Sequence, residues 1–122
     1  MTVHEDAVRH YFTAWNATTP EDLEKAVAAA FTEEATYTAP LADVRGHDGL
    51  AATISGAHQQ FPGFEFRPTG AHDGHHDIVL LGWELVSTAD GSAPVAGSDV
   101  ITLADDGRIA SVSGFLDRVP GA

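Results

Sequence analysis

The sequence predicts an α+β fold in which three N-terminal helices pack on a curved, mainly antiparallel sheet and enclose an apolar pocket. Apolar residues recur at helical spacing in the first half of the chain, and the period changes to that of strands after Gly63. Asp-Gly pairs separate the later strand-sized stretches, which favours sequential hairpins. The chain has 122 residues and no linker-like segment, so we expect one domain over residues 1–122.

Three segments have the apolar spacing of amphipathic helices. The first covers residues 5–17, the second begins at Thr19-Pro20 with a capping hydroxyl before a proline, and the third follows Gly49 and stops at Phe61-Pro62-Gly63. The residues expected on their inner faces are Val8, Tyr11, Phe12 and Trp15; Leu23, Val27, Ala30 and Phe31; and Leu50, Ile54, Ala57 or His58, and Phe61.

Strands are predicted from β-branched and aromatic content and from alternation. The expected strands are residues 35–39, 64–72, 77–88, 95–103 and 108–116. Turns are expected around residues 72–75, 89–92 and 105–107, each of which contains Asp-Gly. Small residues at expected inward positions indicate a barrel that side chains do not fill completely: Ala39, Gly82, Gly97 and Gly114.

Composition excludes several classes of function. The net charge is −12, from 18 acidic and six basic residues, and such a field repels nucleic acids and anionic membranes. No apolar run is long enough to span a bilayer, and the N-terminus lacks a signal-peptide pattern, so a cytoplasmic location is expected. There are no cysteines and no nucleotide-binding motif, and we expect no cofactor and no metal.

Five stretches, in order along the chain, resemble the SnoaL-like branch of the NTF2-like superfamily, which also includes ketosteroid isomerases and limonene epoxide hydrolases. They are residues 11–16 (YFTAWN), 31–37 (FTEEATY), 45–50 (RGHDGL), 97–101 (GSDVI) and 106–109 (DGRI). The resemblance implies a cone-shaped barrel with a deep hydrophobic pocket and a homodimer formed through the outer face of the sheet. It does not imply one reaction, because related folds carry many different activities.

Asp99 is the first candidate for catalysis. Strand alternation places Asp99 on the same face as Ile101 and Leu103, and burial of a carboxylate there should raise its pKa. The position resembles the protonated aspartate in the oxyanion hole of ketosteroid isomerases, and Tyr11 resembles the tyrosine that donates the second hydrogen bond. Two alternatives remain open: Asp99 could face solvent or bond Ser98, and Tyr11 could be an ordinary core residue.

The general base is the weak point of this resemblance. Ketosteroid isomerases have their base just before the proline of the first strand, where this chain has Ala39-Pro40. Limonene epoxide hydrolases use an Asp-Arg-Asp arrangement, and no arginine is expected beside Asp99. His58, near the inner face of the third helix, is the candidate base, although a position on the helix surface is the alternative.

The pocket wall and a histidine-rich turn complete the candidate residues. Trp83 alternates with Val79, Leu81 and Leu85, a pattern that fits core packing, a flat wall for a ring-shaped ligand, or both. The residues expected to bind the ligand are Trp15, Tyr37, Ala39, Ile54, Trp83, Ile101 and Phe115. The run at residues 72–77 contains histidines and aspartates, but as a hairpin tip it would point these side chains apart, so no metal site is predicted.

Two functions follow from these observations. The first is a cofactor-independent isomerase, cyclase or lyase that acts on a small hydrophobic carbonyl compound, such as a polyketide-like or terpenoid molecule, with Asp99 and Tyr11 in catalysis. The second is a non-catalytic domain that binds a lipid-like ligand or mediates dimerisation, which the missing base at Ala39 favours.

Overall fold

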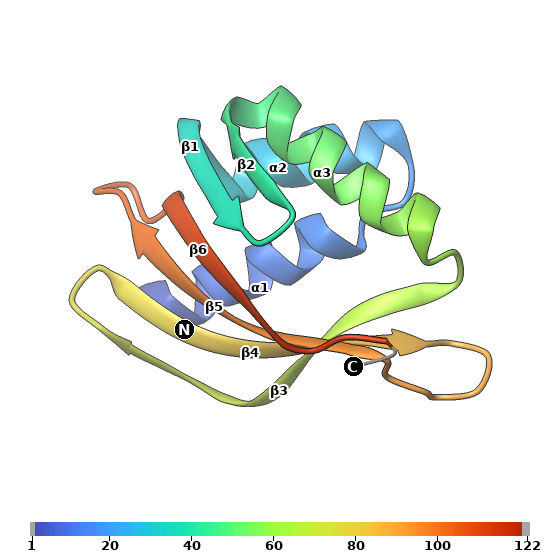
Figure 1. Cartoon of the computed structure of the whole chain (residues 1–122). Coiled ribbons are helices and arrows are strands. Elements are labelled where there is room, and N and C mark those ends of the chain that lie inside the picture. The colour runs from blue at the N-terminus through green and yellow to red at the C-terminus, as the bar shows by residue number, and fades with distance from the viewer. Residues whose placement is uncertain (1, 121–122) are drawn as a thin grey trace.

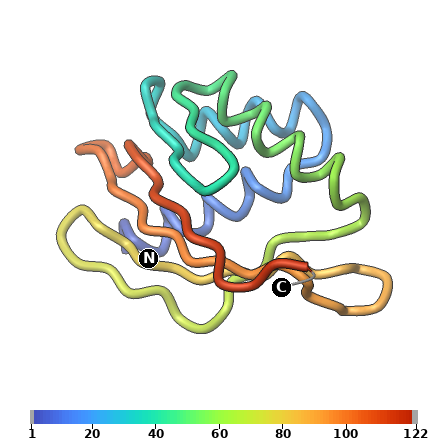
Figure 2. Tube along the Cα trace, in the orientation of Figure 1, coloured from blue at the N-terminus to red at the C-terminus, as the bar shows by residue number. Residues whose placement is uncertain are grey.

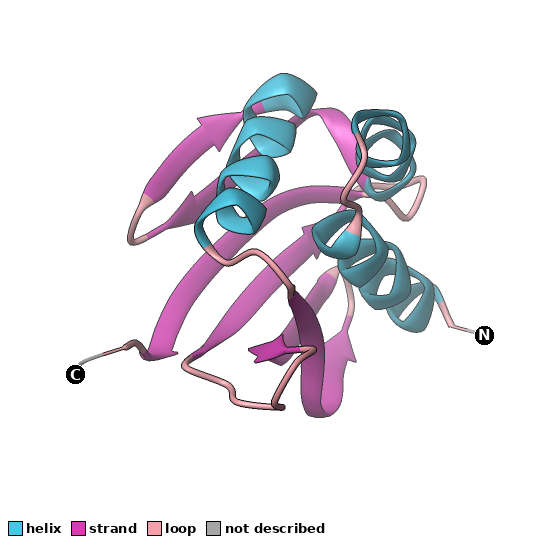
Figure 3. Ribbon diagram, turned by 90° about the vertical axis from the view of Figure 1, so that its right-hand side faces the viewer, coloured by secondary structure: helices cyan, strands magenta, loops and turns pink. Residues whose placement is uncertain are grey.

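A computed structural model describes residues 2–120 and shows three helices on one face of a six-stranded sheet (Figure 1). Figure 3, turned by 90°, shows all three helices on the same side of the strands. The elements are α1 (Val3–Asn16), α2 (Pro20–Ala30), β1 (Phe31–Ala39), β2 (Ala42–Arg45), α3 (Gly46–Gln60), β3 (Phe64–His75), β4 (Ile78–Ser87), β5 (Val95–Leu103) and β6 (Ile109–Arg118).

The sheet has the strand order β2-β1-β6-β5-β4-β3. The strands β3 to β6 form the predicted meander of antiparallel hairpins, while β1 lies parallel to β6 and joins the N-terminal half to the last strand. The sheet curls strongly, so the β1–β2 hairpin stands beside α3 and above the meander (Figure 2). This curvature gives the expected cone-shaped α+β fold.

Local signals in the sequence account for the starts of the first two helices. In α1 the Thr2 hydroxyl accepts a hydrogen bond from the Glu5 N–H, and the Glu5 carboxylate accepts one from the Thr2 N–H. In α2 the Thr19 hydroxyl accepts from the Asp22 N–H at 3.2 Å, and Pro20 is the first helical residue. The predicted start of α2 is therefore confirmed.

Several expectations about element boundaries were wrong, and α3 begins at Gly46 instead of after Gly49. Phe31 is the first residue of β1 and not the last inner residue of α2. The strand β2 was not expected, because its four residues are too short to show a period. The turn after β3 falls at His76 and Asp77, where His76 has a φ of 50°, whereas Asp73 and Gly74 pair with β4.

The core lies between the helices and the concave face of the sheet. Its largest fully buried side chains come from every layer of the fold and are Tyr11, Val27, Phe31, Leu50, Ile54, Val79, Ile101, Ile109 and Val112. Within residues 2–120, no helix is long and apolar enough to cross a membrane. One end of the concave face is not filled by these side chains, and the cavity described next lies there.

Candidate functional site

A cavity of about 390 Å³ opens between α1, α3, the β1–β2 hairpin and the concave face of β4, β5 and β6. This volume is within the range of about 300–1,000 Å³ usual for small-molecule sites. Its lining is mostly apolar and consists of Tyr11, Phe12, Trp15, Tyr37, Ala39, Pro40, Leu41, Ala42, Ala52, Thr53, Gly56, Ala57, Gln60, Phe61, Phe66, Trp83, Leu85, Val95, Asp99 and Leu116. The exposed residues among these, such as Leu41 and Gln60, mark the mouth.

Asp99 lies at the floor of this cavity and is only 3% exposed. Its neighbours across the sheet are Leu81 on β4 and Gly114 on β6. Ser98, the next residue, faces the other side of β5, where its hydroxyl donates to Asp117 at 2.7 Å. The structure therefore places Asp99 on the inward face, as strand alternation predicts, and Ser98 has a different partner.

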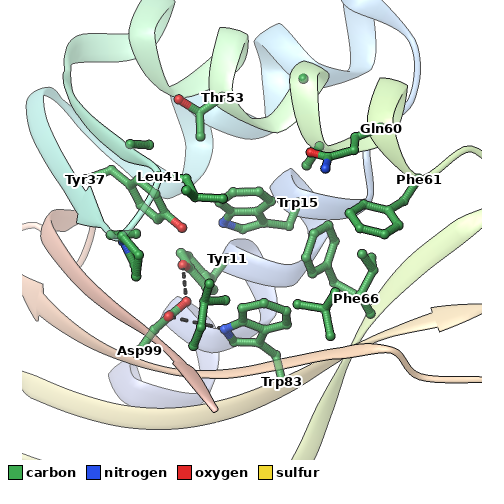
Figure 4. A pocket seen from close by; sticks show the side chains of 18 of the residues that line it. Tyr11, Trp15, Tyr37, Leu41, Thr53, Gln60, Phe61, Phe66, Trp83 and Asp99 are labelled. Carbon is green, nitrogen blue, oxygen red and sulfur yellow. Dashed lines mark hydrogen bonds between the residues drawn. The ribbon is translucent and has the colours of Figure 1, made fainter. Parts of the chain in front are cut away.

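Both oxygens of the Asp99 carboxylate accept a hydrogen bond from an aromatic side chain (Figure 4). The Tyr11 hydroxyl donates to Oδ2 at 2.5 Å, and the Trp83 indole Nε1 donates to Oδ1 at 3.2 Å. Tyr11 comes from α1 and Trp83 from β4, so three separate elements fix the position of the carboxylate. Such a charge-assisted pair of hydrogen bonds holds the side chain in one orientation.

Burial is the main cause of the pKa shifts of Asp99 and of the two tyrosines in the cavity. It raises the pKa of the Asp99 carboxyl above its ordinary value, and the hydrogen bonds from Tyr11 and Trp83 oppose this shift. Burial, followed by the nearby Asp99 charge, raises the pKa of Tyr11 well above its ordinary value and also that of Tyr37. Both phenols therefore remain protonated donors at neutral pH.

Two donors in the cavity wall have no partner within residues 2–120. The Tyr37 hydroxyl makes no hydrogen bond there, although the side chain is only 8% exposed. The Trp15 indole Nε1 is buried and also lacks a hydrogen-bond acceptor. The two rings are adjacent, with centroids 5.5 Å apart, and Figure 4 shows both polar atoms on the same side of the cavity.

Two glycines provide the space around Asp99. A Cβ atom on Gly114 would lie 3.0 Å from Asp99 Oδ1 and 3.7 Å from the Tyr37 hydroxyl, and one on Gly97 would overlap the Trp83 ring. Gly97 is paired directly with Trp83 across β4 and β5, so the indole lies flat on a backbone without a side chain. Gly82 is different: its Cβ would meet Thr69 on the outer side, which corrects its expected inward position.

Comparison with known proteins identifies the family. The sequence profile of the SnoaL-like domain matches residues 8–112. This chain belongs to the SnoaL-like family. A solved structure from Agrobacterium tumefaciens, described as a candidate isomerase of the SnoaL-like family, is 39% identical, with a TM-score of 0.89 over 96% of this chain and 99% of that one.

More distant solved structures share the fold of this SnoaL-like protein. A candidate SnoaL-like polyketide cyclase from Jannaschia sp. is 18% identical, with a TM-score of 0.74 over 96% of this chain and 89% of that one. An NTF2-like protein from Exiguobacterium sp. is 20% identical, with a TM-score of 0.70 over 91% and 98% of the two chains. No curated protein matches the sequence significantly.

Not all of the predicted ligand-binding residues reach the cavity of the SnoaL-like protein. The wall includes Trp15, Tyr37, Ala39 and Trp83. Ile54 and Ile101 are instead fully buried in the core and do not line it. Phe115 is 58% exposed on the outer face, because Gly114 occupies the inward position and successive strand residues point to opposite sides.

His58 does not lie in this cavity either. Its Nε2 atom is 2.6 Å from the backbone carbonyl oxygen of Trp15, so the ring connects α3 to the end of α1. Of the two inward candidates on that turn of α3, Ala57 lines the cavity. The base expected at His58 is therefore not beside Asp99, and Asp99 is the one carboxylate among the lining residues named above.

Several lining residues were not predicted. Phe12 and Phe66 lie on apolar faces that the sequence does show, but core and cavity positions have the same apolar signal. Thr53 and Gln60 belong to a second, polar side of α3 that faces the mouth. Leu41, at the turn between β1 and β2, is 89% exposed, and no sequence signal marks it as part of a pocket.

The histidine-rich turn shows no metal-binding geometry. Among residues 2–120, no three histidine, aspartate or glutamate side chains gather closely enough to hold a metal ion. Gly74 packs against the His4 ring, and the His4 Nε2 lies 2.9 Å from the His76 backbone oxygen. The turn therefore contacts the start of α1.

Proposed function

We propose that this SnoaL-like protein binds a small, mainly apolar carbonyl compound and catalyses cofactor-independent proton transfer in an isomerase, cyclase or lyase reaction. The observation that carries the proposal is the single carboxylate at the floor of an apolar cavity, fixed by Tyr11 and Trp83. A buried carboxylate with a raised pKa is suited to exchanging a proton with a substrate carbon near neutral pH. The names of the Agrobacterium and Jannaschia relatives point to the same broad class of reactions.

The cavity supports the chemical class of ligand. Its volume suits a bicyclic or similar molecule. Along one wall the Phe66 ring packs edge to face against Trp83 and at a tilt against Trp15. A polyketide- or terpenoid-like skeleton would fill such a space, and its carbonyl group would be the polar part. Ala39 holds no base, so Asp99 would have to perform the proton transfer itself.

The first prediction concerns proton exchange in a simple ketone. The protein should accelerate exchange of the α-protons of 1-tetralone for deuterium in D₂O, with a rate that saturates as the ketone concentration rises. Proton NMR measures the rate against buffer alone. Tetralin, which has the same skeleton without the oxygen, should inhibit by occupying the cavity. Saturable binding without any exchange above the buffer rate would favour the non-catalytic ligand-binding function that Ala39 suggests.

We also propose a homodimer formed through the outer face of the sheet. Apolar side chains gather there on β4 and β6, where Ile78 is 38%, Leu80 49% and Phe115 58% exposed. Val100 pairs with Leu80 and lies half-buried between these strands. An exposed apolar patch on a sheet face is a typical site for association, and a second copy would cover it with the same residues.

The dimer prediction is tested by one charge placed in this patch. Leu80→Lys should convert a dimer to a monomer, because two-fold symmetry would bring the lysine close to its own copy. Val3→Lys is the control, since Val3 is equally exposed on α1, away from the sheet. Light scattering after size-exclusion chromatography measures the mass. A wild-type monomer, or a dimer that survives Leu80→Lys, would contradict the proposed interface.

A further inference from the structure

The two tyrosines of the chain lie in the same cavity but are used differently. The Tyr11 hydroxyl proton is engaged by Asp99 at 2.5 Å, which leaves it no proton for a ligand. Tyr37, on β1, lines the cavity, and its hydroxyl makes no hydrogen bond within residues 2–120. Its hydroxyl and Asp99 Oδ1 both lie within 3.7 Å of the position that a Cβ on Gly114 would occupy.

An unpartnered hydroxyl in such an apolar wall requires an explanation. A donor that faces an apolar cavity without a protein acceptor favours a ligand that supplies one. The Tyr37 residue is 8% exposed, and its hydroxyl faces the cavity without a protein partner, while the Trp15 Nε1 beside it is fully buried and lacks an acceptor. The Tyr37 hydroxyl and the Trp15 indole nitrogen therefore lie together on one side of the cavity, with the hydrogen-bonded pair of Tyr11 and Asp99 below them (Figure 4).

We propose that the Tyr37 hydroxyl, with the Trp15 indole beside it, binds the carbonyl oxygen of the ligand, and that Asp99 faces the adjacent carbon. This inference rests on the proposed function for the role of Asp99. It reverses the role expected from the resemblance to ketosteroid isomerases, in which Asp99 and Tyr11 would be the oxyanion donors. The ligand class becomes narrower, because the molecule must present an acceptor oxygen beside the Tyr37 hydroxyl and an acidic C–H bond toward Asp99.

In this arrangement the proton transfer can be written as a balanced reaction through an enolate. The Asp99 carboxylate takes a proton from the carbon next to the carbonyl, and the electrons of that C–H bond form a carbon–carbon double bond. The carbonyl π electrons move to the oxygen, whose developing charge is stabilised by the hydrogen bond from Tyr37. Protonated Asp99 then gives a proton to a carbon of the enolate, either the proton it took or, in D₂O, a deuteron that the carboxyl group has exchanged with solvent, so no other reactant is consumed.

The chain offers its own matched control, because Tyr37→Phe and Tyr11→Phe are the same chemical change in one cavity. Dissociation constants for 1-tetralone and for tetralin are measured by NMR titration. Tyr37→Phe should weaken binding of the ketone about five- to tenfold, as expected for one neutral hydrogen bond, and leave tetralin within about twofold. Tyr11→Phe should weaken ketone binding less than Tyr37→Phe does, since the Tyr11 hydroxyl proton is already donated to Asp99 and is not offered to the ligand.

Three outcomes have different meanings. Equal weakening of ketone and hydrocarbon in Tyr37→Phe would show a packing role and overturn the inference. Loss of ketone affinity in Tyr11→Phe but not in Tyr37→Phe would overturn it in favour of the expected oxyanion pair. Selective loss in Tyr37→Phe in a protein that exchanges no protons would support Tyr37 as the recognition group, and the catalytic proposal alone would fail.

Discussion

Asp99→Asn is expected to lower the rate of 1-tetralone exchange by about 100-fold or more, the usual contribution of a positioned acid–base group. Asparagine has nearly the same shape, but it cannot take up a proton. Its amide would also place an N–H₂ group against either the Tyr11 or the Trp83 donor, in place of the two acceptor oxygens of the carboxylate. The exchange assay by NMR gives the ratio of the two rates directly.

Asp105→Asn is the matched control, because it removes one negative charge from an exposed loop. Its exchange rate should equal that of the wild type. In the wild type, the rate should fall as pH decreases through the Asp99 pKa, since the carboxylate is the active form, and the midpoint should lie above the ordinary carboxyl value because burial raises that pKa. An unchanged rate in Asp99→Asn would rule out Asp99 as the base.

Gly97→Ala is expected to destabilise the fold by about 1–3 kcal/mol, the typical cost of adding a carbon to a well-packed site. The new Cβ would overlap the Trp83 ring and lie 2.6 Å from the Phe115 backbone oxygen, which cannot move without disturbing β6. Displacement of the indole would also break its hydrogen bond to Asp99 and raise the pKa of Asp99 further. Urea unfolding measures the loss of stability.

Gly56→Ala is the control, and it should change the stability in the opposite direction. Gly56 lies inside α3, and a Cβ there would have no atom within 4 Å. Alanine is the better helix former, so this variant should be more stable by about 0.5–1 kcal/mol. A Gly97→Ala variant as stable as the wild type would contradict the prediction, because it would show that the Trp83 ring does not pack closely on the backbone of β5.

The sequence predicts most of the fold because its signals are local and strong. Caps at Thr19 and Pro20 define the start of α2, and alternation along β5 defines which residues face inward. The strand β2 and the parallel pairing of β1 with β6 were missed, since neither a four-residue strand nor a contact between distant segments leaves a periodic signal. The His76 turn was misplaced because the Asp-Gly pair before it lies within a strand.

The site was harder to predict because cavity walls and core have the same composition. The inward position of Asp99 follows from alternation. No sequence pattern shows that Tyr11 and Trp83 both donate to its carboxylate, or that the Tyr37 hydroxyl has no hydrogen-bond partner among the described residues. Ile54 and Ile101 were expected at the wall, but an apolar inward residue is as suited to the core as to a cavity. Phe115 was also expected at the wall, but it faces outward because its neighbour Gly114 takes the inward position beside Asp99.

The parallel pairing of β1 with β6 has a consequence for the order in which the protein folds. Tyr11 and Asp99, the pair at the cavity floor, are 88 residues apart in the chain, and β1 joins the rest of the sheet only through the last strand. Contacts of such high sequence separation slow folding, because a long loop must close before they form. A ribosome-bound chain that lacks β6 could form its helices and first hairpins, but the cavity would be completed only after nearly the whole chain has emerged.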